Sequence, residues 1–178
     1  MTAVTMDKVT HPEGTTYKKS FMLLATAILA LTVGFGSVAG GIFGAFYTWN
    51  QAAVQNVVTP DDAAIPETAV RGPFTMWAQA DIITQHQLDG TDGLYYAEMD
   101  RTVPQVDEAG EPVLDENGEA VMVPNEARAS WFNATTLTTA LSLGIISYAL
   151  SAMAVAVGLT LVAMGFVFLQ IRKRAVLL

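Results

Sequence analysis

The sequence contains no cysteine among its 178 residues. Without thiols the chain cannot form disulfides, use a thiolate nucleophile, or hold an iron–sulfur cluster or a thioether-linked haem. Histidine is almost absent too, because only His11 and His86 occur. The charge pattern places these two on opposite sides of a membrane, so they cannot ligate one haem or form one catalytic dyad. We therefore expect no cofactor and no catalytic metal.

Common patterns of catalytic and nucleotide-binding sites are also missing. The sequence has no G-x-S-x-G elbow and no G-x-x-x-x-G-K-[ST] loop. Every serine except Ser130 lies in or beside one of the two long apolar stretches described below, residues 21–47 and 137–169. No basic stripe is present that could bind nucleic acid. These absences predict a protein that is not an enzyme and that has neither nucleic acid nor a small-molecule substrate among its partners.

Charged residues are absent from two long stretches, residues 20–60 and 129–171. Their apolar parts, residues 21–47 and 137–169, each exceed the roughly 20 helical residues that cross a bilayer core of about 30 Å. The first is too long for the apolar region of a secretory signal peptide, which has about 7 to 15 residues. Aromatic side chains suited to anchoring at a membrane interface are Tyr47, Trp49 and Trp131. The sequence predicts two transmembrane helices.

Basic residues flank this pair of stretches: Lys8, Lys18 and Lys19 precede the first, and Arg172, Lys173 and Arg174 follow the second. Short flanks rich in Lys and Arg stay in the cytoplasm, so both termini of this plasma-membrane protein are expected there. Residues 48–136 carry fifteen acidic residues and three arginines, a formal charge of −12, and are expected outside. The predicted parts are a cytoplasmic tail (1–19), a first transmembrane helix (20–47), an extracytoplasmic acidic domain (48–124), a long helix containing the second span (125–171) and a basic cytoplasmic end (172–178).

Small residues recur at helical spacing in both predicted spans. The first contains the tandem G-x-x-x-G ladder Gly36, Gly40 and Gly44, beside a second row that includes Gly41. Such rows let another helix approach closely in lipid. The second contains a heptad-like seam that favours a shallow left-handed crossing: Ala140, Gly144, Ser147, Ser151, Ala154, Gly158 and Gly165. Because the two patterns favour crossings of opposite hand, we expect at least one face to bind a foreign subunit.

The predicted external domain is small and of mixed α and β type. Residues 48–72 look like a linker, and residues 73–88 predict a short amphipathic helix, with Phe74 and Trp77 as candidate docking residues. This helix could pack on the following hairpin, lie on the membrane surface or dock on a partner. Its lack of Lys and Arg argues against binding of anionic lipid by the helix itself.

A near-repeat follows, in which residues 106–113 and 114–121 share an Asp-Glu-x-Gly core. Turns of this composition predict a β-hairpin or small β-meander. The carboxylates also raise a calcium hypothesis, but the D-x-D-x-D-G loop with a distal Glu is absent and turn chemistry accounts for them. Pro124 and Asn125 then mark the start of the second long helix. The expected fold is thus a membrane α protein, two transmembrane helices with a small acidic α+β insertion.

The order of these segments carries a resemblance, together with VVTPDDAAIP (57–66), RGPFTMWAQADIITQHQL (71–88), YYAEM (95–99) and VPNEARASWFNATTL (123–137). The chain resembles a family of small two-helix membrane proteins of actinobacteria. Similar small proteins occur as accessory subunits of the actinobacterial respiratory supercomplex of cytochrome bc and cytochrome oxidase. The resemblance implies a lipid-embedded subunit at the periphery of an electron-transport complex, with its loop domain on the positive side of the membrane.

Two functional hypotheses follow. The first is a non-catalytic accessory subunit that docks on larger integral membrane subunits and lipid through its small-residue faces and its acidic domain. The alternative is an extracytoplasmic adaptor or sensor that recruits a basic soluble partner through the acidic loop, because opposite charge steers such encounters. The sequence names neither the partner nor the stoichiometry.

Overall fold

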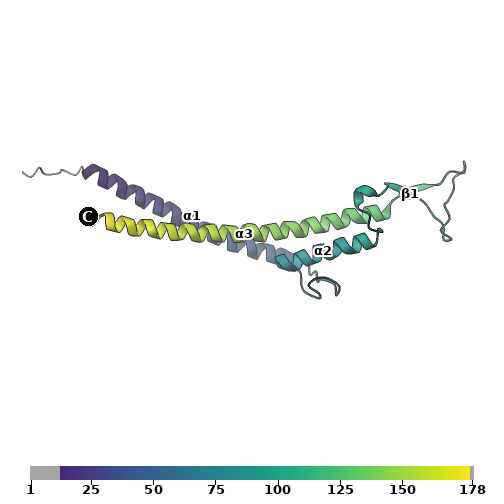
Figure 1. The fold of residues 1–178 in the computed structure, drawn as a ribbon, viewed down its shortest axis with the longest axis horizontal. Coiled ribbons are helices and arrows are strands. Elements are labelled where there is room, and N and C mark those ends of the chain that lie inside the picture. The colour runs from purple at the N-terminus through teal and green to yellow at the C-terminus, as the bar shows by residue number, and fades with distance from the viewer. Residues whose placement is uncertain (1–12, 177–178) are drawn as a thin grey trace, which may run out of the picture. The chain divides into compact units, whose positions relative to one another are not determined.

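The structure is a computed structural model that describes residues 13–176, with side chains for residues 21–174. Its elements in chain order are α1 (Glu13–Val54), α2 (Pro73–Asp89), a short 3₁₀ turn (Tyr96–Glu98), β1 (Thr102–Pro104), β2 (Met122–Pro124) and α3 (Glu126–Val176) (Figure 1). Residues 1–12 of the predicted tail, with His11 and Lys8, lie outside the described residues. The remainder of that tail is helical, since α1 begins at Glu13 rather than at residue 20.

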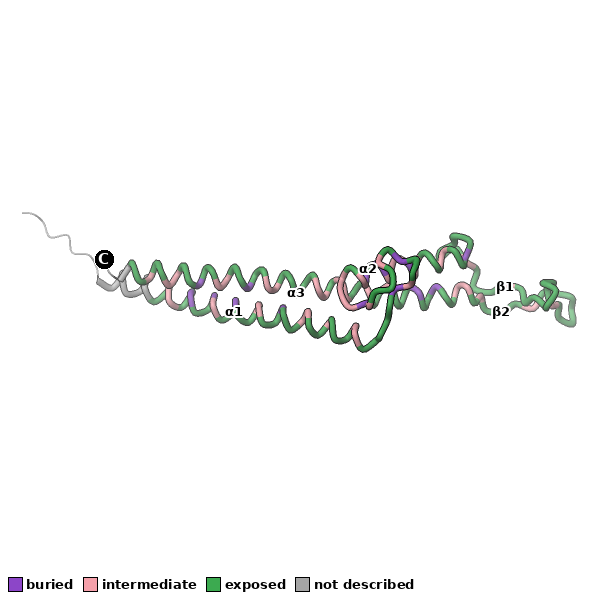
Figure 2. Tube along the Cα trace, turned by 90° about the horizontal axis from the view of Figure 1, so that it is seen from below, coloured by how far each residue is buried: buried purple, intermediate pink, exposed green. Residues whose placement is uncertain are grey.

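Two helices are long and apolar enough to cross a membrane, over Phe21–Val54 and Glu126–Arg174. Only 17% and 11% of their apolar windows are buried, whereas the core helix of a soluble protein would be mostly buried. Figure 2 shows exposed residues along most of α1 and α3, with buried ones in between. The expectation of two long apolar helices, a short helix and a small sheet is confirmed.

The chain divides into two compact units. The first, Met1–Gly44 with Leu150–Leu178, is called the helix-pair unit, because its described part consists of one portion of α1 and one of α3. Its buried residues are small, and include Ala27, Ala30 and Ser151. The second, Ala45–Ala149, is called the loop unit and holds the remaining elements.

In the loop unit, α2 lies beside the first part of α3 (Figures 1 and 2). Pro73 occupies the first helical turn, where its missing N–H costs nothing. The Thr75 hydroxyl oxygen accepts hydrogen bonds from the backbone N–H groups of Arg71 and Gly72, both at 3.1 Å. At the other end, Ser130 of α3 donates to Gln87 Oε1 at 2.8 Å. The sequence leaves three placements open for α2, and one of them is packing on the hairpin. In the structure α2 packs on α3 instead.

Residues 57–70 form an ordered loop and not the expected linker. Val58 and Ala69 pair as an antiparallel bridge, and Thr59 is buried between the two arms. The Thr59 hydroxyl donates to Ile65 O at 2.5 Å and accepts from the Thr68 N–H at 2.9 Å. A polar side chain, Thr59, thus organises the loop. The region has no apolar periodicity, and for this reason its composition resembles that of a linker.

The β structure is a two-stranded antiparallel sheet, in which Val103 is opposite Val123. Between β1 and β2, the near-repeat folds into two equivalent turns at residues 107–111 and 115–119. Gly110 and Gly118 both have φ of +81°, a conformation that favours glycine. Three backbone hydrogen bonds connect the bases of these turns. The N–H of Gln105 donates to Val121 O, the N–H of Val121 donates to Val113 O, and the N–H of Val113 donates to Gln105 O. Of the two predicted forms, the structure has the hairpin, formed by β1 and β2. The near-repeat contributes two turns between these strands and adds no further strand, so there is no meander among the described residues.

The second long helix begins where the sequence predicts. Asn125 caps it, because its Oδ1 accepts a hydrogen bond from the Arg128 N–H at 3.2 Å. The helix then runs without interruption to Val176, beyond the predicted boundary at residue 171. Similarly, α1 extends past the predicted end at residue 47 to Val54. Helices long enough to leave an apolar layer can continue in water where polar residues and caps allow it.

Candidate functional site

The helix-pair unit is built on glycines that allow backbone contact between α1 and α3. A Cβ atom added to Gly34 would lie 2.9 Å from Gly158 O, and one added to Gly158 would lie 2.6 Å from Gly34 O. At Gly41 an added Cβ would approach Ser151 O to 2.6 Å. Gly165 is covered by Leu31 in the same way, at 2.7 Å. Backbone atoms closer than 3.0 Å leave no room for a side chain, so the packing requires glycine at Gly34, Gly41 and Gly158, whereas at Gly165 the Leu31 side chain would have to move.

The predicted interface residues divide into two groups. Gly41, Gly44, Ser151 and Gly158 lie in the contact between α1 and α3, and Ala154 is half-buried. Gly36 and Gly40 do not, because apart from the adjoining backbone of α1 itself no atom of the described residues comes within 4 Å of a Cβ added to either. At about 100° per residue, Gly36 lies on the opposite side of α1 from Gly34, and Gly40 is about a third of a turn from the contact. We call Gly36 and Gly40 the open glycine face.

The sequence did contain a signal for the observed contact. Ala27, Gly34 and Gly41 are buried and recur at intervals of seven residues, which is the spacing of a helix seam. The heptad pattern on α3 has the same seven-residue spacing. The row of Ala27, Gly34 and Gly41 on α1 therefore packs against the heptad row on α3. The more conspicuous G-x-x-x-G ladder obscured this relationship. Only Gly44 of that ladder touches α3, with Ser151 Oγ 2.8 Å from an added Cβ.

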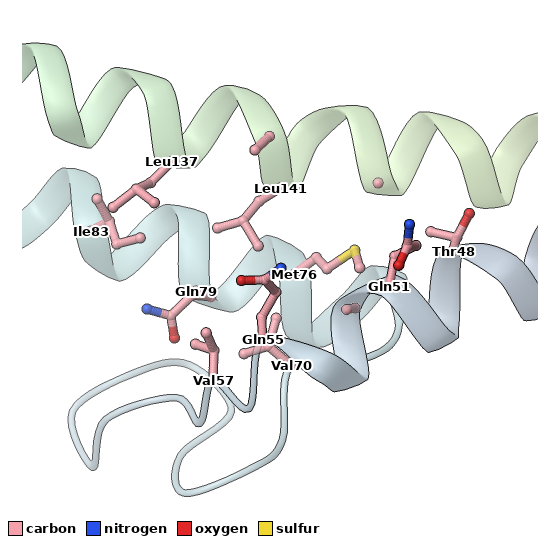
Figure 3. A pocket seen from close by; sticks show the side chains of 13 residues that line it. Thr48, Gln51, Gln55, Val57, Val70, Met76, Gln79, Ile83, Leu137 and Leu141 are labelled. Carbon is pink, nitrogen blue, oxygen red and sulfur yellow. The ribbon is translucent and has the colours of Figure 1, made fainter.

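The loop unit contains a pocket of about 540 Å³ between α1, α2, α3 and the ordered loop (Figure 3). Apolar walls come from Val57 and Val70 of the loop, and from Leu137 and Leu141 of α3. The remaining lining residues are Thr48, Gln51, Ala52, Gln55, Met76, Gln79, Ile83, Ala140 and Gly144. None of the lining residues is charged. The pocket is of a size typical for a ligand of roughly drug size, about 300–1,000 Å³.

Polar groups are few in the pocket, and several are already paired. Thr48 Oγ1 and Ser147 Oγ, 2.7 Å apart, form a hydrogen bond between α1 and α3. Gln51 donates to the Tyr47 hydroxyl at 2.9 Å. In contrast, Gln79 Oε1 is buried and has no hydrogen-bond partner among the described residues. An unsatisfied buried acceptor costs about 1–3 kcal/mol, so this amide is the polar position that an occupant could satisfy.

Arg71 directly follows the lining residue Val70 in the chain and is not itself a lining residue of the pocket. Its guanidinium carbon is 5.5 Å from the centre of the Trp49 ring, and Trp49 stacks in turn on Phe46 at 6.2 Å. Its backbone carbonyl accepts a hydrogen bond from the Tyr148 hydroxyl of α3. Arg71 is therefore fixed against both long helices, among the aromatic side chains at the ends of the apolar stretches.

The predicted aromatic residues differ in exposure. Tyr47 and Trp49 are exposed, as an interfacial anchor must be. Trp131 is only 6% exposed, and its Nε1 donates to Leu94 O at 2.8 Å. This corrects the expectation that Trp131 anchors the chain at the membrane surface, because its ring packs inside the loop unit against Tyr95 at 5.4 Å. Phe74 and Trp77, the candidate docking residues, are 76% and 53% exposed on α2.

The acidic turns are self-contained. Asp115 Oδ1 accepts backbone hydrogen bonds from Glu119 at 2.9 Å and from Asn117 at 2.8 Å, and Asp107 is bound in the equivalent way. Hydrogen bonds from the Glu119 and Asn117 N–H groups lower the pKa of the Asp115 carboxyl. In the described part of the chain, no group of three or more His, Asp or Glu side chains is placed to hold a metal ion. The turn geometry alone explains why Asp stands at these positions.

His86 forms a surface pair with Asp62, in which Nε2 and Oδ2 are 2.6 Å apart. This pair joins α2 to the ordered loop. The hydrogen bond from His86 lowers the pKa of Asp62, although both side chains are about half exposed. The geometry is that of a solvated contact between two elements.

No protein-family model, curated protein or solved structure matches this chain.

Proposed function

We propose that the chain is a non-catalytic accessory subunit of a larger membrane complex. In this proposal α1 and α3 each cross the membrane once, both termini are cytoplasmic, and residues 48–136 lie outside. Support comes from the exposed apolar surface of both helices, which water would not tolerate over such a length. The basic residues at the two ends and the acidic residues in the middle favour this orientation.

The observation that carries the proposal is the open glycine face. Each glycine in a helix costs about 1 kcal/mol relative to alanine. Packing between α1 and α3 compensates this cost at Gly34, Gly41, Gly158 and Gly165, but gives no compensation at Gly36 and Gly40. Two glycines four residues apart on an exposed helix surface suit the close approach of another membrane helix. We infer that this helix belongs to another subunit.

The first complex to be tested is the respiratory supercomplex of cytochrome bc and cytochrome oxidase. This choice rests on the resemblance of the segments between residues 57 and 137 to small actinobacterial accessory proteins. In such an arrangement, the open glycine face would dock on a larger subunit inside the membrane. The exposed Phe74 and Trp77, together with the acidic loop unit, would contact its outer surface.

The test is a comparison of single substitutions by blue-native electrophoresis and co-purification in a mild detergent. Gly40→Ile places a branched side chain on the open glycine face, and we expect recovery in the larger complex to fall by about tenfold or more, as overpacking costs about 1–3 kcal/mol. Ala156→Ile, at another exposed position of α3, is the matched control and should have no effect. Gly158→Ile should instead disrupt the chain's own helix pair.

Two results would contradict the proposal. One is migration of the unaltered chain as a lone small protein after mild solubilisation. The other is a Gly40→Ile chain that assembles as well as the Ala156→Ile control. Membrane insertion is measured separately, by resistance to alkaline extraction, so that a failure to insert is not mistaken for a failure to assemble.

A second candidate, an adaptor that recruits a basic soluble protein, is favoured by the formal charge of −12 over residues 48–136. Exposed charges separated by more than about 8–10 Å are screened at physiological salt. Binding through this surface would therefore weaken steeply as salt rises, whereas a helix interface in lipid would not. Co-purification at two salt concentrations distinguishes the two functions.

A further inference from the structure

The pocket of the loop unit lies at the end of the two apolar helices where aromatic residues gather. Its α1 residues begin at Thr48, between Tyr47 and Trp49, and its α3 residues end at Gly144, one turn before Tyr148. Tyr and Trp collect at the level of lipid headgroups in membrane proteins. If the helices cross a membrane as proposed, the pocket therefore opens where lipid is the neighbouring solvent.

The chemistry of the walls favours a hydrocarbon occupant. The lining has no charge, and leucine, valine, isoleucine, methionine and alanine side chains dominate it. Water gains little in such a space, because a buried water needs about two to four polar partners. Figure 3 shows Val57 and Val70 of the loop on one side and Leu137 and Leu141 of α3 on the other. The ordered loop closes the pocket on one side, which suits a narrow flexible chain better than a second helix.

A cationic side chain follows the pocket-lining Val70 in the chain and stacks on Trp49, which follows the lining residue Thr48. Arg71 is the first Lys or Arg after Lys19 in the sequence. Within the described residues it has no salt bridge to a carboxylate, although residues 48–136 contain fifteen acidic side chains. Trp49 and the backbone hydrogen bond from Tyr148 hold it in place. Arginine binds phosphate through two parallel N–H···O bonds, and an unpaired arginine at headgroup level is suited to a lipid phosphate.

We propose that this pocket is a phospholipid site, in which one acyl chain fills the apolar pocket and the lipid phosphate is bound by Arg71. The proposal rests on the membrane crossing in the proposed function. Gln79 completes the site: its amide can accept from a headgroup donor or, after a half-turn, donate to an ester carbonyl. Because the loop unit is acidic and repels lipids of net negative charge, a zwitterionic lipid is the appropriate probe.

The experiment is native mass spectrometry of the full chain, purified in a mild detergent and titrated with phosphatidylethanolamine or with diacylglycerol of the same acyl chains. We expect one tightly bound phosphatidylethanolamine per chain, and binding of diacylglycerol weaker by about tenfold or more, since a hydrogen bond to a charged group contributes about 1.5–3 kcal/mol. Equal binding of the two lipids would overturn the role of Arg71.

Two pairs of variants locate the site. Ala140→Phe fills the pocket and should abolish the bound lipid, whereas Ala149→Phe, at an exposed position of α3 outside the lining, should retain it. Arg71→Gln should remove the preference for phosphatidylethanolamine over diacylglycerol. Arg101→Gln removes another external arginine that has no salt bridge within the described residues, and should leave the preference intact. Thermal unfolding followed by circular dichroism confirms that each variant is folded.

The outcomes separate this proposal from the proposed function. Loss of bound lipid in Ala140→Phe with normal co-purification of the larger complex supports a lipid site. An unaltered chain that binds no lipid would overturn the proposal. In that case, selective loss of complex formation in Ala140→Phe would assign the pocket to a partner subunit. Complete release of the unaltered chain by alkaline extraction would contradict the membrane crossing itself.

Discussion

The hydroxyl of Tyr148 in α3 donates a hydrogen bond to the backbone carbonyl of Arg71, 77 residues earlier in the chain. This contact fixes the start of α2 on α3, since Arg71 lies two residues before Pro73. It also holds the Arg71 backbone while the side chain reaches over Trp49. Through these two contacts, the segment between the ordered loop and α2 is connected to both long helices of the loop unit.

Removing this hydroxyl should loosen the loop unit locally. Tyr148→Phe deletes the donor but keeps the ring, so we expect a loss of about 1 kcal/mol in the free energy of unfolding. Amide hydrogen exchange should accelerate in residues 71–76 in particular. Tyr47→Phe is the control, because the Tyr47 hydroxyl accepts a hydrogen bond from Gln51, one turn away on the same helix at an exposed surface. Unchanged exchange in Tyr148→Phe would show that other contacts position α2.

The burial of Trp131 gives a second prediction. Trp131→Phe removes the N–H that donates to Leu94 O at 2.8 Å, so this carbonyl keeps only the hydrogen bond from the Thr91 hydroxyl. We expect destabilisation of about 1–3 kcal/mol, from the lost hydrogen bond and from the space that the smaller ring leaves at this buried site, measured by thermal unfolding in detergent. Trp77→Phe, at a site 53% exposed, should change stability by less than about 0.5 kcal/mol. Equal effects of the two substitutions would mean that Trp131 lies at the surface, as the sequence alone suggested.

The turn at Asp115 should depend on pH in a defined direction. Its carboxylate accepts backbone hydrogen bonds from Glu119 and Asn117, which lower its pKa below the ordinary value of an aspartate, 3.8. The stabilisation of the turn is therefore fully present above about pH 3.8 and is lost as the pH falls through the lowered pKa of the folded state. An NMR titration should give a midpoint for the Asp115 carboxyl below 3.8.

Asp115→Asn is the matched variant for this titration. The amide oxygen still accepts the two backbone hydrogen bonds but cannot be protonated in this range. Amide protection of Asn117 and Glu119 should then be independent of pH between about 2 and 5, apart from the intrinsic exchange rate. A midpoint for Asp115 at or above 3.8 in the unaltered chain would contradict the turn geometry.

The elements that local sequence could predict are those whose cause is local. The start of α2 at Pro73 and the cap of α3 at Asn125 depend on residues within one turn of the helix end. The paired turns at Gly110 and Gly118 depend on glycine conformation and on an Asp side chain four residues before the turn closes. The length of the two uncharged apolar stretches also indicated both long helices. Each of these features can be read within a window of a few residues or from one continuous apolar stretch.

The features that were missed depend on distant partners. Thr59 organises its loop through bonds to residues six and nine positions away, which no periodicity reveals. Trp131 has the composition of an interfacial anchor, and only the position of residues 91–95 explains its burial. Likewise, the ladder Gly36, Gly40 and Gly44 was recognised as a packing surface, but α3 occupies a neighbouring face of the helix.

The sequence by itself determined that two long, uncharged, apolar helices enclose an acidic segment, because composition and helical period depend on each residue alone. It also determined which positions are small enough for close helix contact. Only the tertiary structure decided which of those positions meet, since the seven-residue spacing of α1 has to match that of α3. The same pairing left Gly36 and Gly40 open, and the packing of α2 and the loop on the long helices formed a pocket beside Arg71.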